Sequence, residues 1–285
     1  MNTATGASTR TSGARLRALP RTVRRNAYRL VPPSRRIKGL GGARGRGVLQ
    51  LRKLVAPFWQ RPVTLVSRQG VRLRVTADPV DEQIAQHVLG PHRTDYFPAP
   101  PPKIPGSACI LDVGAHHGFY AAVALHEYPD AHLICVEPSG PARAQLKANL
   151  ELNGTGARVR IVDAALAPAA GRGELRHTTE GSWGSSLYEE ASPAISTESV
   201  RLATLAEILG DERPAIVKCN AEGAEFALIE HLSTTDIRPE FMVVMVHPEF
   251  GDVDVLVATA TSMGYRTVPV GTEHRPAFQM WRAAG

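Results

Sequence analysis

The sequence predicts an α/β protein built on a doubly wound, mostly parallel sheet. From residue 107 onward, apolar strand-like runs alternate with helix-like stretches, and alternation at this spacing is typical of a parallel sheet with helices on both faces. Glycines directly follow the first of these runs, as they do where a strand turns into a helix at a ligand site. The chain has 285 residues, which is long enough to bury a substantial core.

Three regions of different composition divide the chain. Residues 1–58 are rich in Arg, Gly and Ser and have weak apolar periodicity, which predicts a basic, flexible leader. Residues 59–106 are expected to form a small N-terminal cap that ends in a proline-rich linker. Residues 107–285 carry the alternating pattern and form the predicted main domain.

The cap is predicted to contain one hairpin and one helix. Residues 62–77 alternate apolar and polar positions around a Gln-Gly break, which indicates a β-hairpin. A short helix is expected over 80–90. Five prolines between residues 98 and 106 then predict a stiff, irregular linker.

The main domain is predicted to alternate strands and helices to its end. The expected strands are 107–113, 132–138, 157–167, 214–225 and 241–250, and the expected helices are 119–128, 141–154, 226–232 and 253–264. Two short strand-like segments, 265–271 and 277–283, are expected to pair as a terminal hairpin. The identity of a substrate is expected to depend on the region before residue 107 and on the insertion 172–200, and neither shows a pattern that identifies one.

The positive charge of the chain is concentrated at its start. Residues 1–77 hold 18 of the 33 Lys and Arg residues and none of the 27 acidic ones, which leaves the rest of the chain with a net charge of −12. This leader has three interpretations: a solvated tail, contact with an anionic membrane surface, or phosphate contacts with a nucleic acid. Few aromatic residues accompany the charges, which disfavours base stacking.

The cysteines and the hydropathy favour a cytoplasmic location. Cys109, Cys135 and Cys219 each stand in an apolar run, and their odd number does not make a disulfide framework, so we expect buried thiols in a reducing compartment. No apolar run approaches the roughly 20 residues of a spanning helix, and no apolar stretch follows the charged N-terminus as in a signal peptide. Peripheral membrane contact through the leader stays open.

The loop after the first strand of the main domain is the first candidate ligand site. It reads Asp112-Val-Gly114-Ala115-His116-His-Gly118 and stands between an apolar strand and a helix. Gly114 permits a tight turn, and Gly118 is expected to let the backbone approach a ligand closely. Free amides at the helix start favour a polar or anionic group, although a glycine pair can also be an ordinary turn.

Two acidic strand ends are expected at the same edge of the sheet. Glu137 follows the second strand, 19 residues after Gly118, at the offset where a nucleoside-binding domain binds ribose hydroxyls with an acid. Asn220, Glu222 and Glu225 cluster after the fourth strand. Asn220 is also a good helix N-cap, and the two carboxylates favour a helix dipole, so capping and function are both compatible with this cluster.

The loop pattern restricts the class of cofactor. Where a dinucleotide site has G-x-G-x-x-G, His116 occupies the position of the middle glycine, which counts against NAD. The chain also lacks the G-x-x-x-x-G-K-[ST] loop of a nucleoside triphosphate site.

Four motifs in order resemble one known family. The stretches ILDVGAHHGFYA, CVEPSGPARAQLKANLELN and VKCNAEGAEFALIEHL, together with WGSSL at 183–187, look like the FkbM family of S-adenosylmethionine-dependent methyltransferases over about residues 107–270. The resemblance implies a class I methyltransferase fold, which is Rossmann-like and has an antiparallel last strand. It makes 107–285 an S-adenosylmethionine-binding catalytic domain.

The resemblance also implies roles for individual residues. Asp112, Gly114, Ala115 and Gly118 would hold the methionine end of the cofactor, and Glu137 would hold the ribose hydroxyls. The residues expected at the adenine and at the methyl group or acceptor are Asp163, Ala164, Asn220 and Glu222.

Two residues depart from the family pattern. The family usually has Asn at the place of His116 and Asp at the place of Asn220. An imidazole can still hydrogen-bond a carboxylate, so His116 is compatible with cofactor binding. Loss of the Asp removes a candidate carboxylate base or metal ligand, and we therefore expect no metal.

The candidate catalytic residues lie at two strand ends. Methyl transfer to an alcohol needs a group that takes the hydroxyl proton, and an imidazole has a suitable pKa for this near neutrality. His247 and Glu249, after the fifth strand, are candidates together with Glu222. His247 could equally be a strand-end histidine bonded to the backbone.

Three functions follow from these observations. The first is O-methylation of a sugar, polyketide or similar small acceptor, which makes the expected partner a small molecule or glycan. The second is an RNA methyltransferase that uses the basic leader for affinity, with a steep dependence on salt. The third is a cofactor-binding module that has lost catalysis, as Asn220 suggests.

Overall fold

The computed structural model describes residues 62–76, 79–90, 92–178, 187, 194–271 and 276–283. The predicted leader at 1–58 and residues 183–186 of the WGSSL motif lie outside the described residues, so those predictions stay untested. Among the described residues, no helix has the length and apolar character needed to cross a membrane.

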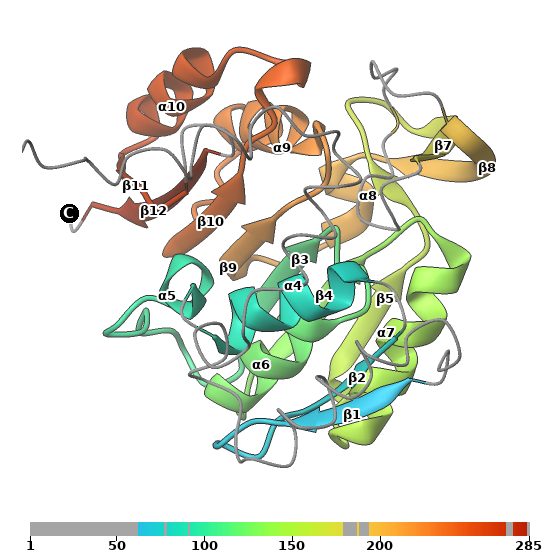
Figure 1. Cartoon of the computed structure of the whole chain (residues 1–285). Helices are drawn as coiled ribbons and strands as arrows, with labels where there is room; N and C mark the ends of the chain where they lie inside the picture. Colours follow the sequence, from blue (N-terminus) through green and yellow to red (C-terminus); the bar gives the residue numbers. More distant parts are fainter. Residues whose placement is uncertain are drawn as a thin grey trace, which may run out of the picture.

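A seven-stranded sheet forms the centre of the molecule (Figure 1). Its strand order is β11-β12-β10-β9-β3-β4-β5. The strands are β3 (Cys109–Val113), β4 (His132–Val136), β5 (Val159–Val162), β9 (Pro214–Cys219), β10 (Phe241–Met245), β11 (Tyr265–Pro269) and β12 (Ala277–Arg282). Pairing is parallel except at β12, which runs antiparallel to both of its neighbours. The predicted terminal hairpin and class I methyltransferase arrangement are thus confirmed.

Helices cover both faces of this sheet, as predicted. The helices of the main domain are α6 (Phe119–Glu127), α7 (Gly140–Leu152), α8 (Leu205–Leu209), α9 (Ala224–Ser233) and α10 (Val253–Ser262). Successive strand residues point to opposite faces, so Leu133 and Cys135 of β4 join the core under α6 and α7, whereas Ile134 and Val136 join the core under α8, α9 and α10. Both apolar cores are therefore built from the same strands.

The N-terminal cap packs on the face covered by α6 and α7. Its hairpin consists of β1 (Val63–Val66) and β2 (Arg72–Val75), which pair antiparallel as predicted. The predicted helix is α4 (Pro79–Leu89), and a further short helix, α5 (Arg93–Tyr96), was not anticipated. Leu65, Leu73, Ala85 and Val88 belong to the same buried cluster as α6. The cap therefore shares a core with the main domain.

Strand boundaries differ from the prediction in three places. The expected third strand is divided, because β5 ends at Val162 and β6 (Ala165–Leu166) pairs with β8 (Ala194–Ala203) in a separate sheet that also contains β7 (Gly171–Thr178). The fourth strand ends at Cys219, and residues 220–223 form a loop. The fifth ends at Met245, and a 3-10 turn follows at Pro248–Phe250, where proline has no backbone N–H for a ladder.

The strand order fixes where a ligand site can lie. From β3 the chain proceeds through β4 to β5 on one side, and then crosses to β9 on the other side. The order therefore reverses between β3 and β9, and ligands of open α/β sheets bind beyond the carboxyl ends of strands at such a point.

Candidate active site

The loop after β3 depends on glycine for two different reasons. Gly114 has a φ of +72°, and a Cβ there would lie 2.1 Å from the Asn220 carbonyl oxygen, so only glycine lets the loops after β3 and β9 meet. Gly118 has a φ of +75°, and a Cβ there would lie 2.3 Å from Leu146 Cδ1 in α7. At Gly118 the missing side chain thus makes room for Leu146 of α7, and the expected contact of its backbone with a ligand stays a prediction.

Two non-glycine residues among those described adopt a left-handed backbone. They are His116 (φ 48°) and Glu222 (φ 45°), one in the loop after β3 and the other in the loop after β9. Such conformations are costly for residues with side chains and collect at functional sites. Their occurrence at the strand-order reversal marks these two loops as the candidate site.

Glu137 is held rigidly at the end of β4. Its Oε2 accepts a hydrogen bond from the His116 backbone N–H at 2.8 Å, and its Oε1 accepts one from the Ser139 N–H at 2.8 Å. Burial raises the pKa of Glu137, and the two backbone donors oppose that rise. Each carboxylate oxygen has a second lone pair, so each can accept one further hydrogen bond, such as one from a hydroxyl group.

Asp112 is paired with a lysine that the sequence analysis did not identify. Asp112 is fully buried, and Lys218 Nζ lies 2.8 Å from its Oδ1. Lys218 Nζ also donates to the carbonyl oxygens of Val113 and Gly114. Burial alone lowers the pKa of Lys218, but the Asp112 carboxylate outweighs this and raises it. The buried Asp112–Lys218 pair therefore holds the start of the glycine loop against β9.

The loop after β9 is fixed on both sides. The Asn220 N–H donates to the Val113 carbonyl at 3.1 Å, and the Asn220 side chain is hydrogen-bonded to Tyr96 of α5. Glu225, in the first turn of α9, is fully buried and its Oε2 accepts from the Gly223 N–H at 2.9 Å. These contacts hold Asn220 next to the loop after β3.

His247 lies between two carboxylates. Its Nδ1 is 2.9 Å from Glu225 Oε1, and its Nε2 is 3.3 Å from Glu222 Oε1. The His247 backbone N–H also donates to Glu225 at 2.8 Å. Burial lowers the pKa of His247, but the hydrogen bonds and charges of Glu222 and Glu225 outweigh it and raise the pKa to about 10. At neutral pH this histidine is therefore an imidazolium ion, with both ring nitrogens protonated.

The other predicted site residues lie at the rim or below the surface. Asp163 is exposed and forms an ion pair with Arg143 at 2.7 Å, whereas Ala164 and Ala115 are buried. Arg143 also donates to the Glu137 and Pro138 carbonyls and so links the ends of β4 and β5. Glu249 is exposed in the 3-10 turn.

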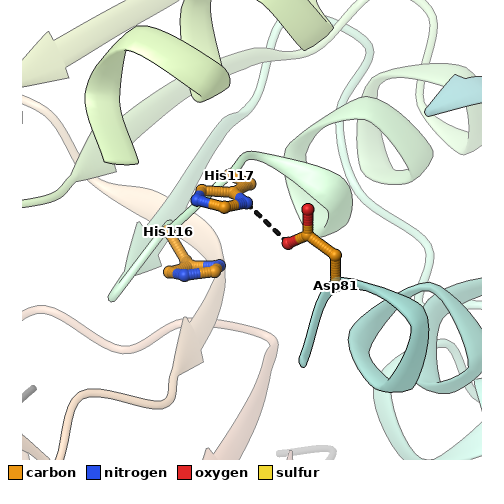
Figure 2. A group of neighbouring side chains, drawn as sticks. All are labelled: Asp81, His116 and His117. Carbon is orange, nitrogen blue, oxygen red and sulfur yellow. Dashed lines mark hydrogen bonds and ion pairs between the residues drawn. The ribbon is translucent and has the colours of Figure 1, made fainter. Parts of the chain in front are cut away.

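A group of potential metal ligands lies beside the glycine loop (Figure 2). Asp81, His116 and His117 each place one ligand atom within 4.8 Å of the others. However, the two imidazole rings are stacked, with centroids 3.8 Å apart and planes inclined by 15°. A metal ion lies near the plane of each imidazole ring that binds it. Two stacked rings lie in different, nearly parallel planes, so in this conformation no nearby position suits an ion bound by both rings. Burial and the neighbouring His117 lower the pKa of His116 to about 3.

The structure brings together most of the predicted residues. Gly114 meets Asn220 and is linked to Asp112 through Lys218, while His116 donates a hydrogen bond to Glu137. Glu222 and His247 form a second group with Glu225, and Glu249 stands apart. The sequence analysis did not identify Lys218, Arg143 and Asp81, whose side chains contact the glycine loop or the end of β4. For Lys218 the available signal was a lysine within an apolar strand.

Comparison with known proteins identifies a family. The family described as "Methyltransferase FkbM domain" matches residues 112–267. No curated protein matches the chain. Among solved structures, the chain is similar to methyltransferase FkbM from Methylobacillus flagellatus KT, with 13% identity and a TM-score of 0.46, covering 91% of this chain and 60% of that one. The chain therefore spans less than two thirds of the length of that structure.

Two further solved structures show weaker similarity. One is precorrin-6y C5,15-methyltransferase from Geobacter metallireducens GS-15, with 12% identity and a TM-score of 0.38 over 62% of this chain and 81% of that one. The other is TrmK from M. capricolum in complex with S-adenosyl-homocysteine, with 11% identity and a TM-score of 0.38 over 62% of each chain. The family match alone covers more than half of the sequence. The chain belongs to the FkbM family of S-adenosylmethionine-dependent methyltransferases.

Proposed function

We propose that this protein transfers a methyl group from S-adenosylmethionine to a hydroxyl oxygen of a small acceptor such as a sugar or polyketide. The observation that carries the proposal is the Glu222–His247–Glu225 cluster. Glu222 lies in the loop after β9, which is the loop that meets Gly114. Glu225 lies at the start of α9, and His247 lies just beyond β10. Glu222 offers a carboxylate that can accept a hydroxyl proton at this edge, and His247 fixes its orientation.

The end of β4 fits the cofactor. A ribose presents two neighbouring hydroxyl groups, and Glu137 presents two oxygens whose positions are fixed by the backbone N–H groups of His116 and Ser139. A charged acceptor forms stronger hydrogen bonds than a neutral one. This preformed acceptor supports assignment of Glu137 to the ribose.

The remaining cofactor contacts are assigned by position. Gly114, Ala115, His116 and Gly118, supported by Asp112, would surround the methionine end of the cofactor. The adenine would lie near Asp163 and Ala164 at the end of β5, and Asn220 would lie near the methyl group. Since the Asp112 carboxylate is fully buried and paired with Lys218, we assign it to holding the loop.

The chemistry divides between the cofactor and the protein. When bound, S-adenosylmethionine supplies an electrophilic methyl group on a sulfonium, which is a good leaving group. We assign the protein two tasks, which are to hold the acceptor oxygen in line with that methyl group and to take the hydroxyl proton.

We assign proton removal to Glu222. A histidine with a pKa of about 10 already carries its proton at neutral pH, so it is a poor proton acceptor in this state. Its Nε2–H instead orients the Glu222 carboxylate, while the buried Glu225 holds Nδ1–H. In this mechanism Glu222 Oε accepts the proton and His247 is its positioning partner. This changes the role expected for His247 from the sequence.

A labelled methyl donor tests the proposal. The full chain is incubated with methyl-labelled S-adenosylmethionine and, separately, with a panel of sugars, hydroxylated polyketides and total tRNA. We expect label in an alcohol as an alkali-stable methyl ether. Glu222→Gln is expected to lower kcat about 100-fold or more. Glu230→Gln, which changes an exposed residue of α9, is expected to retain wild-type activity.

Other outcomes would replace the proposal with one of the alternatives. Label in tRNA, with binding that weakens steeply as salt rises, would indicate an RNA methyltransferase. Binding of S-adenosylhomocysteine without transfer to any acceptor would indicate a non-catalytic module. Failure to bind S-adenosylhomocysteine would reject the cofactor assignment itself.

A further inference from the structure

Asp81 connects the N-terminal cap to the glycine loop. It lies in the first turn of α4, outside the family-matched residues 112–267, and its side chain is fully buried. Its Oδ1 is 2.6 Å from His117 Nδ1, and its Oδ2 accepts a hydrogen bond from the Thr76 N–H at 2.6 Å. Figure 2 shows the carboxylate reaching from its helix to the His117 ring.

A carboxylate in this position constrains its partners. A buried charge is costly unless it is paired and hydrogen-bonded, and each Asp81 oxygen has one such partner. His117 is itself 6% exposed, so its ring is confined and its Nδ1 is directed at Asp81. A second buried residue, Asn149 of α7, donates to the His117 carbonyl and accepts from the Arg74 N–H in β2. The ring and the backbone of His117 are thus both fixed by groups outside the loop.

The constraint reaches the candidate cofactor site through His116. The His117 ring stacks on the His116 ring. His116 adopts the left-handed conformation, with a φ of 48°, and its backbone N–H donates to Glu137 Oε2. A left-handed non-glycine residue persists only where its surroundings hold it there. The direct path from Asp81 to Glu137 therefore consists of two histidines and one backbone N–H.

We infer that Asp81 is a positioning residue for cofactor binding. It holds the His116–His117 turn so that the His116 N–H points at Glu137, and it does so from the N-terminal cap, beyond the family domain. The inference rests on the proposed cofactor site. Because Asp81 contacts neither cofactor nor acceptor in this scheme, its loss weakens cofactor affinity by disordering the turn.

The test compares cofactor affinity with stability in matched variants. Binding of S-adenosylhomocysteine is measured by calorimetry, and unfolding by thermal melt, for the full-length wild type, Asp81→Ala and Asp81→Asn. We expect Asp81→Ala to raise Kd about tenfold or more, since a hydrogen bond to a charged group is lost at the turn. Asn keeps the shape and can accept from Thr76 and donate to His117, so Asp81→Asn is expected to raise Kd less.

A second histidine–carboxylate pair supplies the control. Glu212 Oε1 lies 3.0 Å from His132 Nε2 at the start of β4, which is the opposite end of the sheet from the site. Glu212→Ala is expected to leave Kd unchanged whatever its effect on the melt. The nitrogen NMR signals of His117 add a spectroscopic readout, because we expect a proton on Nδ1 in the wild type and a changed signal in both Asp81 variants.

Each outcome decides the inference. A folded Asp81→Ala that binds within twofold of the wild type overturns it, and so does a rise in Kd that Glu212→Ala reproduces. If Asp81→Ala does not fold, Asp81→Asn decides: a Kd raised about threefold with an altered His117 signal supports the inference, and an unchanged Kd overturns it. If the wild type itself does not bind S-adenosylhomocysteine, the proposed function fails first and takes this inference with it.

Discussion

Lys218 stands directly opposite Asp112 in the register of β9 and β3, and its ammonium group bridges the Asp112 carboxylate and two carbonyl oxygens of the glycine loop. The two residues are 106 positions apart in the sequence. Neither side chain is more than slightly exposed. The pair connects β3 and β9, the two strands between which the strand order reverses. It therefore stabilises the carboxyl-terminal edge of the sheet, where the candidate site lies.

Removal of the lysine should leave a buried charge unpaired. We expect Lys218→Met to lower the free energy of unfolding by about 3–5 kcal/mol, because removing one partner of a buried ion pair leaves the other charge buried and uncompensated. Urea unfolding at neutral pH measures this. Lys103→Met, which removes an exposed lysine, should change stability by less than about 0.5 kcal/mol. A similar small change in Lys218→Met would show that the pair is not needed for the fold.

Gly114 should tolerate no side chain. Alanine there meets two penalties, the left-handed backbone and a Cβ placed 2.1 Å from the Asn220 carbonyl oxygen. Gly154 has a similar φ of +66° but has nothing within 4 Å of its Cβ position, so Gly154→Ala isolates the backbone penalty of about 1–2 kcal/mol. We expect Gly114→Ala to cost at least about 2 kcal/mol more than Gly154→Ala in denaturant unfolding. Equal costs would show that the loops separate easily.

The order of the strands made much of the site predictable. In a parallel sheet every strand carries its following loop to the same edge, so Glu137, Asn220 and His247 could be placed together from strand ends alone. The conformation of the glycine loop was also predictable in part, because a glycine directly after an apolar strand indicates a tight turn. The positive φ of Gly114 agrees with that prediction. The order of the four motifs then indicated the family, which the family match confirms.

The side-chain partners could not be predicted because they depend on register and packing. Glu225 was understood as a residue that favours the helix dipole, but it is fully buried and bonded to His247, 22 residues away. Asp81 reaches His117 across 36 residues. The antiparallel strands β7 and β8 were missed because they carry polar residues on both faces, which hides the alternation that indicates a strand.

Arg143 should contribute to cofactor affinity through two strand ends. It pairs with Asp163 after β5 and donates to the Glu137 carbonyl after β4, and these two residues are assigned to the adenine and the ribose. We expect Arg143→Ala to raise the Kd of S-adenosylhomocysteine about tenfold by calorimetry, since it removes several charge-assisted hydrogen bonds. Arg213→Ala, which removes a long and exposed ion pair with Asp236, serves as the control. Equal Kd values for the two variants would contradict the assignment.

The His247 cluster should make stability depend on pH in the alkaline range. The pKa of His247 is raised from 6.5 to about 10 in the folded protein, so its contribution is fully present below pH 6.5 and is lost as the pH rises through 10. We expect the wild type to lose on the order of 3 kcal/mol more stability than His247→Gln between those two pH values. Urea unfolding at several pH values measures the difference.

A matched histidine variant separates this effect from general alkaline denaturation. His126 is an exposed residue of α6, and His126→Gln should follow the wild-type curve throughout. The carboxylates Glu222 and Glu225 face His247 from the loop after β9 and from α9, so Glu222→Gln should flatten the curve in the same direction as His247→Gln, but less. Parallel curves for the wild type and His247→Gln would mean that the histidine is not held as an imidazolium. Glu222 would then lose its positioning partner, and His247 itself would become the better proton acceptor.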